Sequence, residues 1–243
     1  EPSEQYGDKH LGELMIEPEV LAKDVAWLDS QGMTVKIHAT GDRAVRAALD
    51  AFEHARNTNV RAGAMHEVSH AEMIHPDDLV RFDDLNVAAE MCPILWYPGP
   101  AVDTMKITLG DRANYFWPVK SLTEAGALVF YGSDWPAVVP DTNPWPGIEA
   151  MISREDPYGK NPGKYWPEQA VDLKAALRIF TINGAIAGKQ EKTTGSLEAG
   201  KRADFIILES NIFEIPTAAL SDVQVLQTFV DGEAVFQRVP AGE

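Results

Sequence analysis

A regular alternation of helix-like segments with short strand-like segments is the feature that most constrains the fold of this chain. Apolar residues recur every three or four positions in the helix-like segments, whereas the strand-like segments are short apolar runs. The expected helices lie at 17–31, 43–56, 76–84 and 119–125, and the expected strands at 34–39, 62–70, 86–92 and 127–133. Strands that alternate with helices predict βαβ units in a parallel sheet, where ligands bind at the carboxyl ends of the strands.

Two long segments interrupt or follow this pattern. Residues 93–115 and 135–170 are rich in Pro, Gly and Trp, and we expect them to be binding loops. Asp42 is expected to cap the helix that follows it. Beyond the loops, residues 172–187 predict one amphipathic helix.

The sequence pattern changes from alternating helices and strands to turn-punctuated strands near residues 188–195, where we place a domain boundary. The segments 195–209 and 223–239 are β patterns punctuated by turns. Asp231-Gly232 is a dipeptide typical of a two-residue β-hairpin. We therefore expect strands rather than further βα units in this part of the chain.

The composition is that of a globular protein and excludes several classes of function. Hydrophobic residues make up 45% and charged residues 24%. The net charge of −16 repels phosphate backbones, so we expect no nucleic-acid partner, and no run approaches the roughly 18–20 apolar residues of a membrane helix. The single cysteine, Cys92, excludes an intramolecular disulfide framework and suits a cytoplasmic location.

Three residues at the expected strand ends carry the chemistry. They are His38 in KIHATGD, His70 in EVSHAEM and Asp134 in YGSDWP. Two imidazoles and a carboxylate that converge from separate strands suit a divalent metal such as zinc. The residues alone leave open whether each histidine is a ligand or a hydrogen-bonded structural group. His66 is expected to be a packed histidine.

Four segments, 35–56, 69–93, 130–157 and 193–216, resemble the amidohydrolase superfamily. The resemblance is to its family 3 branch, which includes N-substituted formamide deformylase-like enzymes. GSDWP and GSLEAGKRADFIIL are its most specific motifs, and the second is typical of the small β-sandwich attached to barrels of this family. The segments cover most of the chain and follow the family's order.

The resemblance implies an α/β fold made of the C-terminal half of a TIM (β/α)₈ barrel, strands 5 to 8, over residues 1–190. Residues 191–243 would supply the C-terminal strands of the small β-sandwich. His38 and His70 match the metal-binding histidines of strands 5 and 6. Asp134 matches the strand 8 aspartate, which is a metal ligand and the general base. The implied cofactor is one or two divalent ions, zinc first.

The resemblance also assigns a substrate pocket to the loops after strands 7 and 8. The side chains that would line it are Trp96, Tyr97, Trp135 and Trp145. Ordinary loop packing is an equally good interpretation of these four aromatic residues. The implied substrate is a small molecule with a C–N bond outside peptides: an amide, a formamide or a cyclic amide.

The chain departs from the family pattern at its beginning and at two internal positions. It contains no His-x-His pair, which the family carries on strand 1, and no counterpart of the bridging residue on strand 4. Ser69 stands where the family commonly has Glu, and Cys92 where it often has Gln; we expect Cys92 to be a buried thiol. We therefore expect a fragment whose partner is the N-terminal half or a second copy. The alternatives are a catalytically inactive half-barrel scaffold and a deaminase or carbon–oxygen hydrolase on the same fold.

Overall fold

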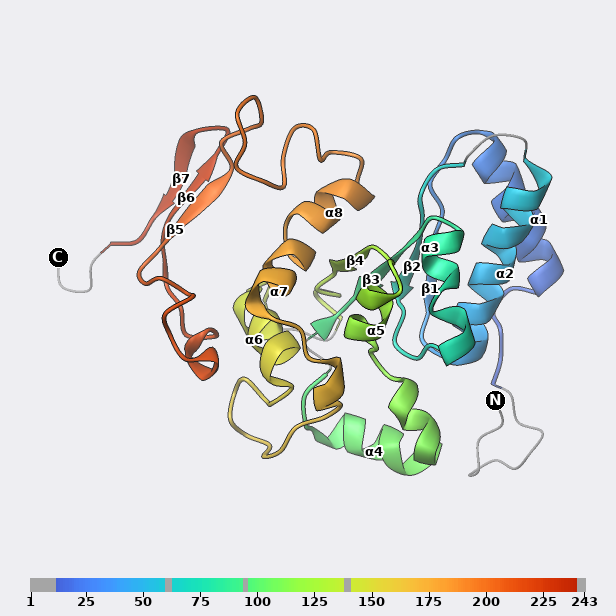
Figure 1. The fold of residues 1–243 in the computed structure, drawn as a ribbon, viewed down its shortest axis with the longest axis horizontal. Helices are drawn as coiled ribbons and strands as arrows, with labels where there is room; N and C mark the ends of the chain where they lie inside the picture. The colour runs from blue at the N-terminus through green and yellow to red at the C-terminus, as the bar shows by residue number, and fades with distance from the viewer. Residues whose placement is uncertain (1–11, 60–62, 94–95, 138–140, 240–243) are drawn as a thin grey trace.

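The protein is described by a computed structural model over residues 12–59, 63–93, 96–137 and 141–239 (Figure 1). Its first part is built on a four-stranded sheet. The strands are β1 (Lys36–Ala39), β2 (His66–His70), β3 (Val87–Met91) and β4 (Val129–Tyr131). They pair in the order β1-β2-β3-β4, and every pair is parallel. The predicted parallel α/β sheet is therefore confirmed.

Helices connect the strands and cover the sheet. The helical elements before β4 include α1 (Pro18–Ser30), α2 (Asp42–Thr58), η1 (Pro76–Asp78), α3 (Arg81–Asp84), α4 (Pro100–Leu109) and α5 (Val119–Glu124). Helices α1 and α2 lie side by side at one end of the molecule (Figure 1). The apolar face predicted for the second helix, with Val45, Leu49 and Phe52, is completely buried.

Three local expectations are wrong. Asp42 does not cap α2; Gly41 is the N-cap, and the Asp42 carboxylate accepts a hydrogen bond from the next backbone N–H, that of Arg43, at 2.8 Å. The helix expected over 76–84 divides into η1 and α3. The helix expected over 172–187 divides into α7 (Leu173–Ile179) and α8 (Ile182–Ala187). Thr181 lies at that break, and its hydroxyl donates to the Leu177 carbonyl at 2.6 Å, a contact that competes with regular helix bonding.

The two segments expected to be long loops contain helices. Helix α4 and a 3₁₀ turn, η3 (Gly110–Tyr115), occupy the first of them, and α6 (Trp145–Ser153) and η4 (Pro167–Gln169) occupy the second. The prolines in these segments favoured loops in the sequence analysis. In the structure, proline stands in the first turn of α4, α6 and η4, where a backbone N–H has no carbonyl partner within the helix and its loss costs nothing.

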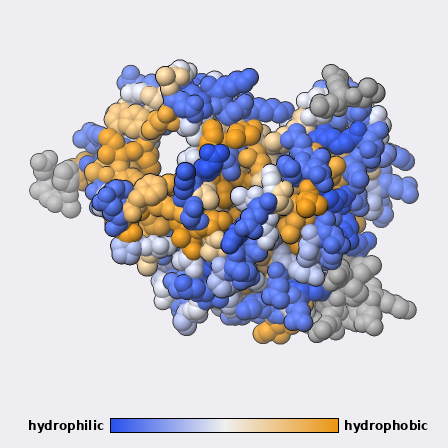
Figure 2. All heavy atoms as spheres, in the orientation of Figure 1, coloured by the Kyte–Doolittle hydropathy of each residue, from blue (hydrophilic) through white to orange (hydrophobic). Residues whose placement is uncertain are grey.

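The C-terminal part is a three-stranded antiparallel sheet, β5 (Phe205–Leu208), β6 (Val225–Val230) and β7 (Glu233–Gln237). Asp231 and Gly232 join β6 to β7 with φ values of 54° and 84°, so the predicted hairpin is confirmed. Figure 1 places this sheet at the opposite end of the molecule from α1, and Figure 2 shows apolar residues gathered over it. It is anchored through η5 (Thr217–Ala219) and the residues after it: the buried Glu149 carboxylate of α6 accepts from the Ser221 backbone N–H at 2.8 Å.

A buried polar cluster joins α1, α2 and β2. The Asp29 carboxylate lies 3.0 Å from His66 Nε2 and accepts hydrogen bonds from Arg56 at 3.1 Å and from the Asn59 amide at 2.7 Å. The other ring nitrogen of His66 accepts from the Val35 backbone N–H at 3.1 Å. His66 is fully buried, as predicted for a packed histidine.

Stability is expected to fall as the pH drops below about 6.5 because of His66. Burial lowers the pKa of His66 below its ordinary value of 6.5, and the neighbouring Arg56 lowers it further, while Asp29 opposes both. The unfolded chain then binds the proton more tightly, so the contribution of His66 is complete above pH 6.5 and is lost as pH falls through the folded-state pKa.

The free energy of unfolding in urea, measured at about pH 7.5 and about pH 5.5, tests this expectation. The wild type should lose more stability between the two values than His66→Gln, which cannot titrate. His54→Gln, a change on the exposed side of α2, should behave like the wild type. Equal losses in the wild type and His66→Gln would show that His66 does not set this pH dependence.

The helices of the described ranges include none with the length and apolarity that a bilayer span requires.

Candidate functional site

The carboxyl edge of the parallel sheet brings His38 and His70 together. The register of β1 and β2 pairs Ala39 with His70, so the two histidines belong to neighbouring strand ends. Their ring centroids lie 4.5 Å apart, and the rings meet edge to face at 70°. His70 is buried, has a φ of 67° and ends its strand, because a left-handed residue cannot continue the pleat.

Asp134 joins the two histidines from the segment after β4. Its Oδ1 atom lies 3.9 Å from His70 Nε2. Asp134 also has a left-handed φ, 54°, which is uncommon for a residue with a side chain and is often found at functional sites. The three residues predicted from separate strand ends therefore lie at one edge of the sheet.

Two further side chains contact His70 on its other ring nitrogen. Glu72 Oε1 lies 3.7 Å from His70 Nδ1, and Cys92 Sγ lies 3.8 Å from the same atom. Cys92 is buried, as predicted, and burial raises the pKa of its thiol to about 12. Glu72 was not predicted, because it follows two residues with left-handed backbones, His70 and Ala71, and no spacing rule points to it.

The electrostatics at this edge favour a neutral His70. Burial and the charge of His38 lower the pKa of His70, against the opposite effects of Asp134 and Glu90. Burial and, after it, the charge of Asp134 raise the pKa of Glu72 to about 7. A neutral imidazole is the form that binds a metal.

The donor chemistry of His38, His70 and Asp134 fits zinc, which proteins bind through imidazole nitrogens and carboxylate oxygens. Within the described ranges, no three His, Cys, Asp or Glu side chains already surround a common point in the manner of a metal site. The residues thus fit the ion in type and in placement at one edge. Their roles as ligands stay a prediction.

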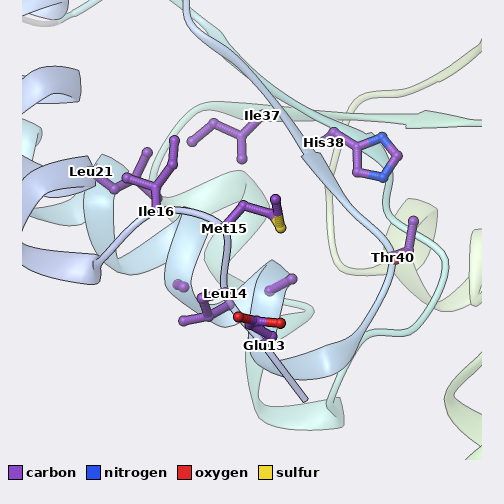
Figure 3. A pocket seen from close by; sticks show the side chains of 10 residues that line it. Glu13, Leu14, Met15, Ile16, Leu21, Ile37, His38 and Thr40 are labelled. Atoms are coloured by element: carbon purple, nitrogen blue, oxygen red, sulfur yellow. The ribbon is translucent and has the colours of Figure 1, made fainter.

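A cavity of about 250 Å³ opens beside His38. Figure 3 shows His38 and Thr40 at one end of it and Leu21 and Ile16 at the other, with Met15 between them. Because most of its lining is apolar, the cavity suits a hydrocarbon group next to the imidazole of His38.

Comparison with known proteins explains this combination of fold and side chains. A profile of the amidohydrolase family matches residues 1–236. The chain belongs to the amidohydrolase family. The match is to the family 3 branch, as the sequence motifs predicted.

Among curated proteins, the chain is 30% identical over 235 residues to the protein LONG AFTER FAR-RED 3 of Arabidopsis thaliana, over 96% of the chain and 40% of that protein. It is 30% identical over 207 residues to an N-substituted formamide deformylase of Arthrobacter pascens, over 85% of the chain and 37% of the enzyme. The chain thus spans about 40% of the length of these relatives.

Among solved structures, the chain is similar to a metal-dependent hydrolase of Pyrococcus horikoshii OT3, with a TM-score of 0.68 and 27% sequence identity. That match covers 86% of the chain and 40% of the other chain.

The four aromatic residues predicted to line a substrate pocket lie in different environments. Trp96 and Trp145 are buried in the hydrophobic core, and Trp96 lies under the guanidinium of Arg154 at 4.7 Å. Tyr97 packs edge to face against Tyr158, with ring centroids 6.2 Å apart. Trp135 is 54% exposed and follows Asp134 directly. The structure thus gives Trp96 and Trp145 a packing role, and contact of any of the four with substrate stays a prediction.

Proposed function

We propose that this chain supplies the metal-binding edge of a hydrolase that cleaves a C–N bond in an amide, formamide or cyclic amide other than a peptide. The observation that carries the proposal is the meeting of His38, His70 and Asp134 at the carboxyl edge of a parallel sheet. Family membership supports it, as does the likeness to an N-substituted formamide deformylase.

His38 and His70 would hold a divalent ion, zinc first, through their ring nitrogens, with Asp134 as a carboxylate ligand. When bound, zinc polarises a substrate carbonyl and lowers the pKa of water. One oxygen of Asp134 takes the proton of the attacking water and passes it to the leaving nitrogen as the C–N bond breaks. The apolar cavity beside His38 would hold a hydrocarbon substituent of the substrate.

The proposed architecture is half of a (β/α)₈ barrel that further strands complete. Among the described residues, the order β1-β2-β3-β4 gives the outer strands β1 and β4 one paired strand each, which leaves sheet edges where further strands could pair; on β4 the Asn183 side chain already donates to the Val129 carbonyl at 2.8 Å. The chain also covers about 40% of the relatives it resembles. The proposed partner is an N-terminal segment of the same polypeptide or a second copy of the chain, which would complete the metal site.

Metal analysis and hydrolysis assays on the polypeptide expressed from its complete gene test the proposal. We expect about one or two zinc ions per chain and hydrolysis of N-substituted formamides, N-acyl amides or cyclic amides. Removal of zinc with a chelator should abolish turnover, and added zinc should restore it. A polypeptide that retains full turnover without metal would contradict the proposal. One that neither binds zinc nor hydrolyses these substrates would favour the scaffold alternative.

A further inference from the structure

Strand β3 carries none of the three predicted ligands, yet its Glu90 side chain contacts all three elements that do. Glu90 Oε1 accepts a hydrogen bond from Lys36 Nζ on β1 at 2.6 Å. The other carboxylate oxygen accepts from the hydroxyl of Ser69 on β2. The side chain also lies against Gly132, just after β4.

Each contacted residue precedes a predicted ligand by one or two positions in the sequence. Lys36 precedes His38 by two residues and therefore shares its face of β1. Ser69 directly precedes His70, and the register pairs Ser69 with His38. Gly132 precedes Asp134 by two residues. One carboxylate thus links the strand ends that carry His38, His70 and Asp134.

The contact at Gly132 leaves no room for a side chain. A Cβ atom at this position would lie 2.6 Å from Glu90 Oε1 and 2.7 Å from Glu90 Cδ, well inside van der Waals contact. The glycine is therefore required by the close approach of Glu90. A side chain at position 132, or loss of the carboxyl group at position 90, must change how the ends of β3 and β4 fit together.

The hydrogen bonds of Glu90 are stronger than those of an ordinary surface pair. Its side chain is 15% exposed, and it accepts from a charged ammonium group and a hydroxyl at the same time. Lys36 Nζ also lies 3.5 Å from Glu67 Oε2, so a second carboxylate on the same face of the sheet holds the ammonium group in place. Such bonds hold side chains and backbone in one arrangement and orient neighbouring ligands.

Relying on the proposed function for the identity of the bound ion, we propose that Glu90 is a positioning residue for the metal centre. It fixes the relative positions of the ends of β1, β2 and β4, and Gly132 is its steric counterpart. Glu90 itself binds neither metal nor substrate.

A double-mutant cycle between positions 90 and 132 tests the inference in the polypeptide from the complete gene. Glu90→Ala and Gly132→Ala should each weaken zinc binding by about 10-fold or more, measured by competition with a chromophoric chelator. In the Glu90→Ala background, Gly132→Ala should add less than about 2-fold, because the clashing atoms are gone. Glu90→Gln, which keeps the shape and an acceptor oxygen, should recover most of the affinity. Gly184→Ala, where a Cβ meets nothing within 4 Å, is the matched control.

A second readout does not depend on zinc. In the metal-free protein, Glu90→Ala and Gly132→Ala should move the ring signals of His38 and His70 in histidine ¹H–¹⁵N spectra. The signals of His54, on the exposed side of α2, should stay in place. Additive effects of the two substitutions on zinc binding, or unmoved His38 and His70 signals, would overturn the inference. A wild type that binds no zinc would sink the proposed function, and the spectra would still decide the role of Glu90.

Discussion

Replacing Asp134 with asparagine is expected to lower kcat for C–N hydrolysis by at least about 100-fold. The amide cannot take a proton from water, and it replaces the proposed anionic metal ligand with a neutral one. Asp134 Oδ1 lies 3.9 Å from His70 Nε2, at the proposed metal site, so the loss of the proton acceptor and the loss of the charge both act there. Steady-state kinetics on an N-substituted formamide or a related amide measures the effect.

Asp84→Asn makes the same chemical change at an exposed position of α3 and should leave kcat unchanged. Zinc content measured on both variants separates the two roles of Asp134. Loss of turnover with zinc retained indicates the proton-transfer role, and loss of both indicates the ligand role. Wild-type turnover in Asp134→Asn would remove Asp134 from the mechanism.

Replacing Asp29 with alanine is expected to lower the free energy of unfolding by about 3 kcal/mol or more. The buried carboxylate is the common partner of His66, Arg56 and Asn59, so its removal takes one acceptor from each of these three polar side chains. Burial raises the pKa of Asp29, but the hydrogen bond from Asn59 and then the charges of His66 and Arg56 bring it below its ordinary value. Urea denaturation followed by circular dichroism measures the loss.

Two variants calibrate this result. Asp29→Asn keeps one acceptor oxygen and the shape of the side chain, so it should cost less than Asp29→Ala. Asp24→Ala, on the exposed side of the same helix, should change stability by no more than about 0.5 kcal/mol. Equal stability of Asp29→Ala and Asp24→Ala would mean that the buried cluster contributes nothing to folding.

The parallel sheet could be predicted from the sequence because its strands are short apolar runs between amphipathic helices. The meeting of His38, His70 and Asp134 was predictable for a related reason: the carboxyl ends of parallel strands share one edge, whatever the intervening loops do. The breaks inside the predicted helices were not, since they depend on single contacts such as the Thr181 hydroxyl on the Leu177 carbonyl.

The rest of the site could not be predicted because it depends on contacts between residues far apart in the sequence. Glu90 occupies an ordinary alternating position of β3, and nothing in its neighbours reveals the ammonium group of Lys36 on β1. The burial of Trp96 beneath Arg154 likewise arises from segments that approach each other only in the folded chain. Aromatic residues in a Pro-rich and Gly-rich stretch therefore predict a loop better than they predict what the rings contact.

The close approach of Glu90 to Gly132 also constrains the order in which this protein can change over evolutionary time. Every replacement of a glycine adds at least one carbon atom, and here that atom would overlap a carboxylate. A lineage can therefore vary position 132 at little further cost only after position 90 has become smaller, a first change that itself weakens zinc binding, whereas the reverse order passes through a steric clash. The residue types at positions 90 and 132 should therefore vary together among related sequences.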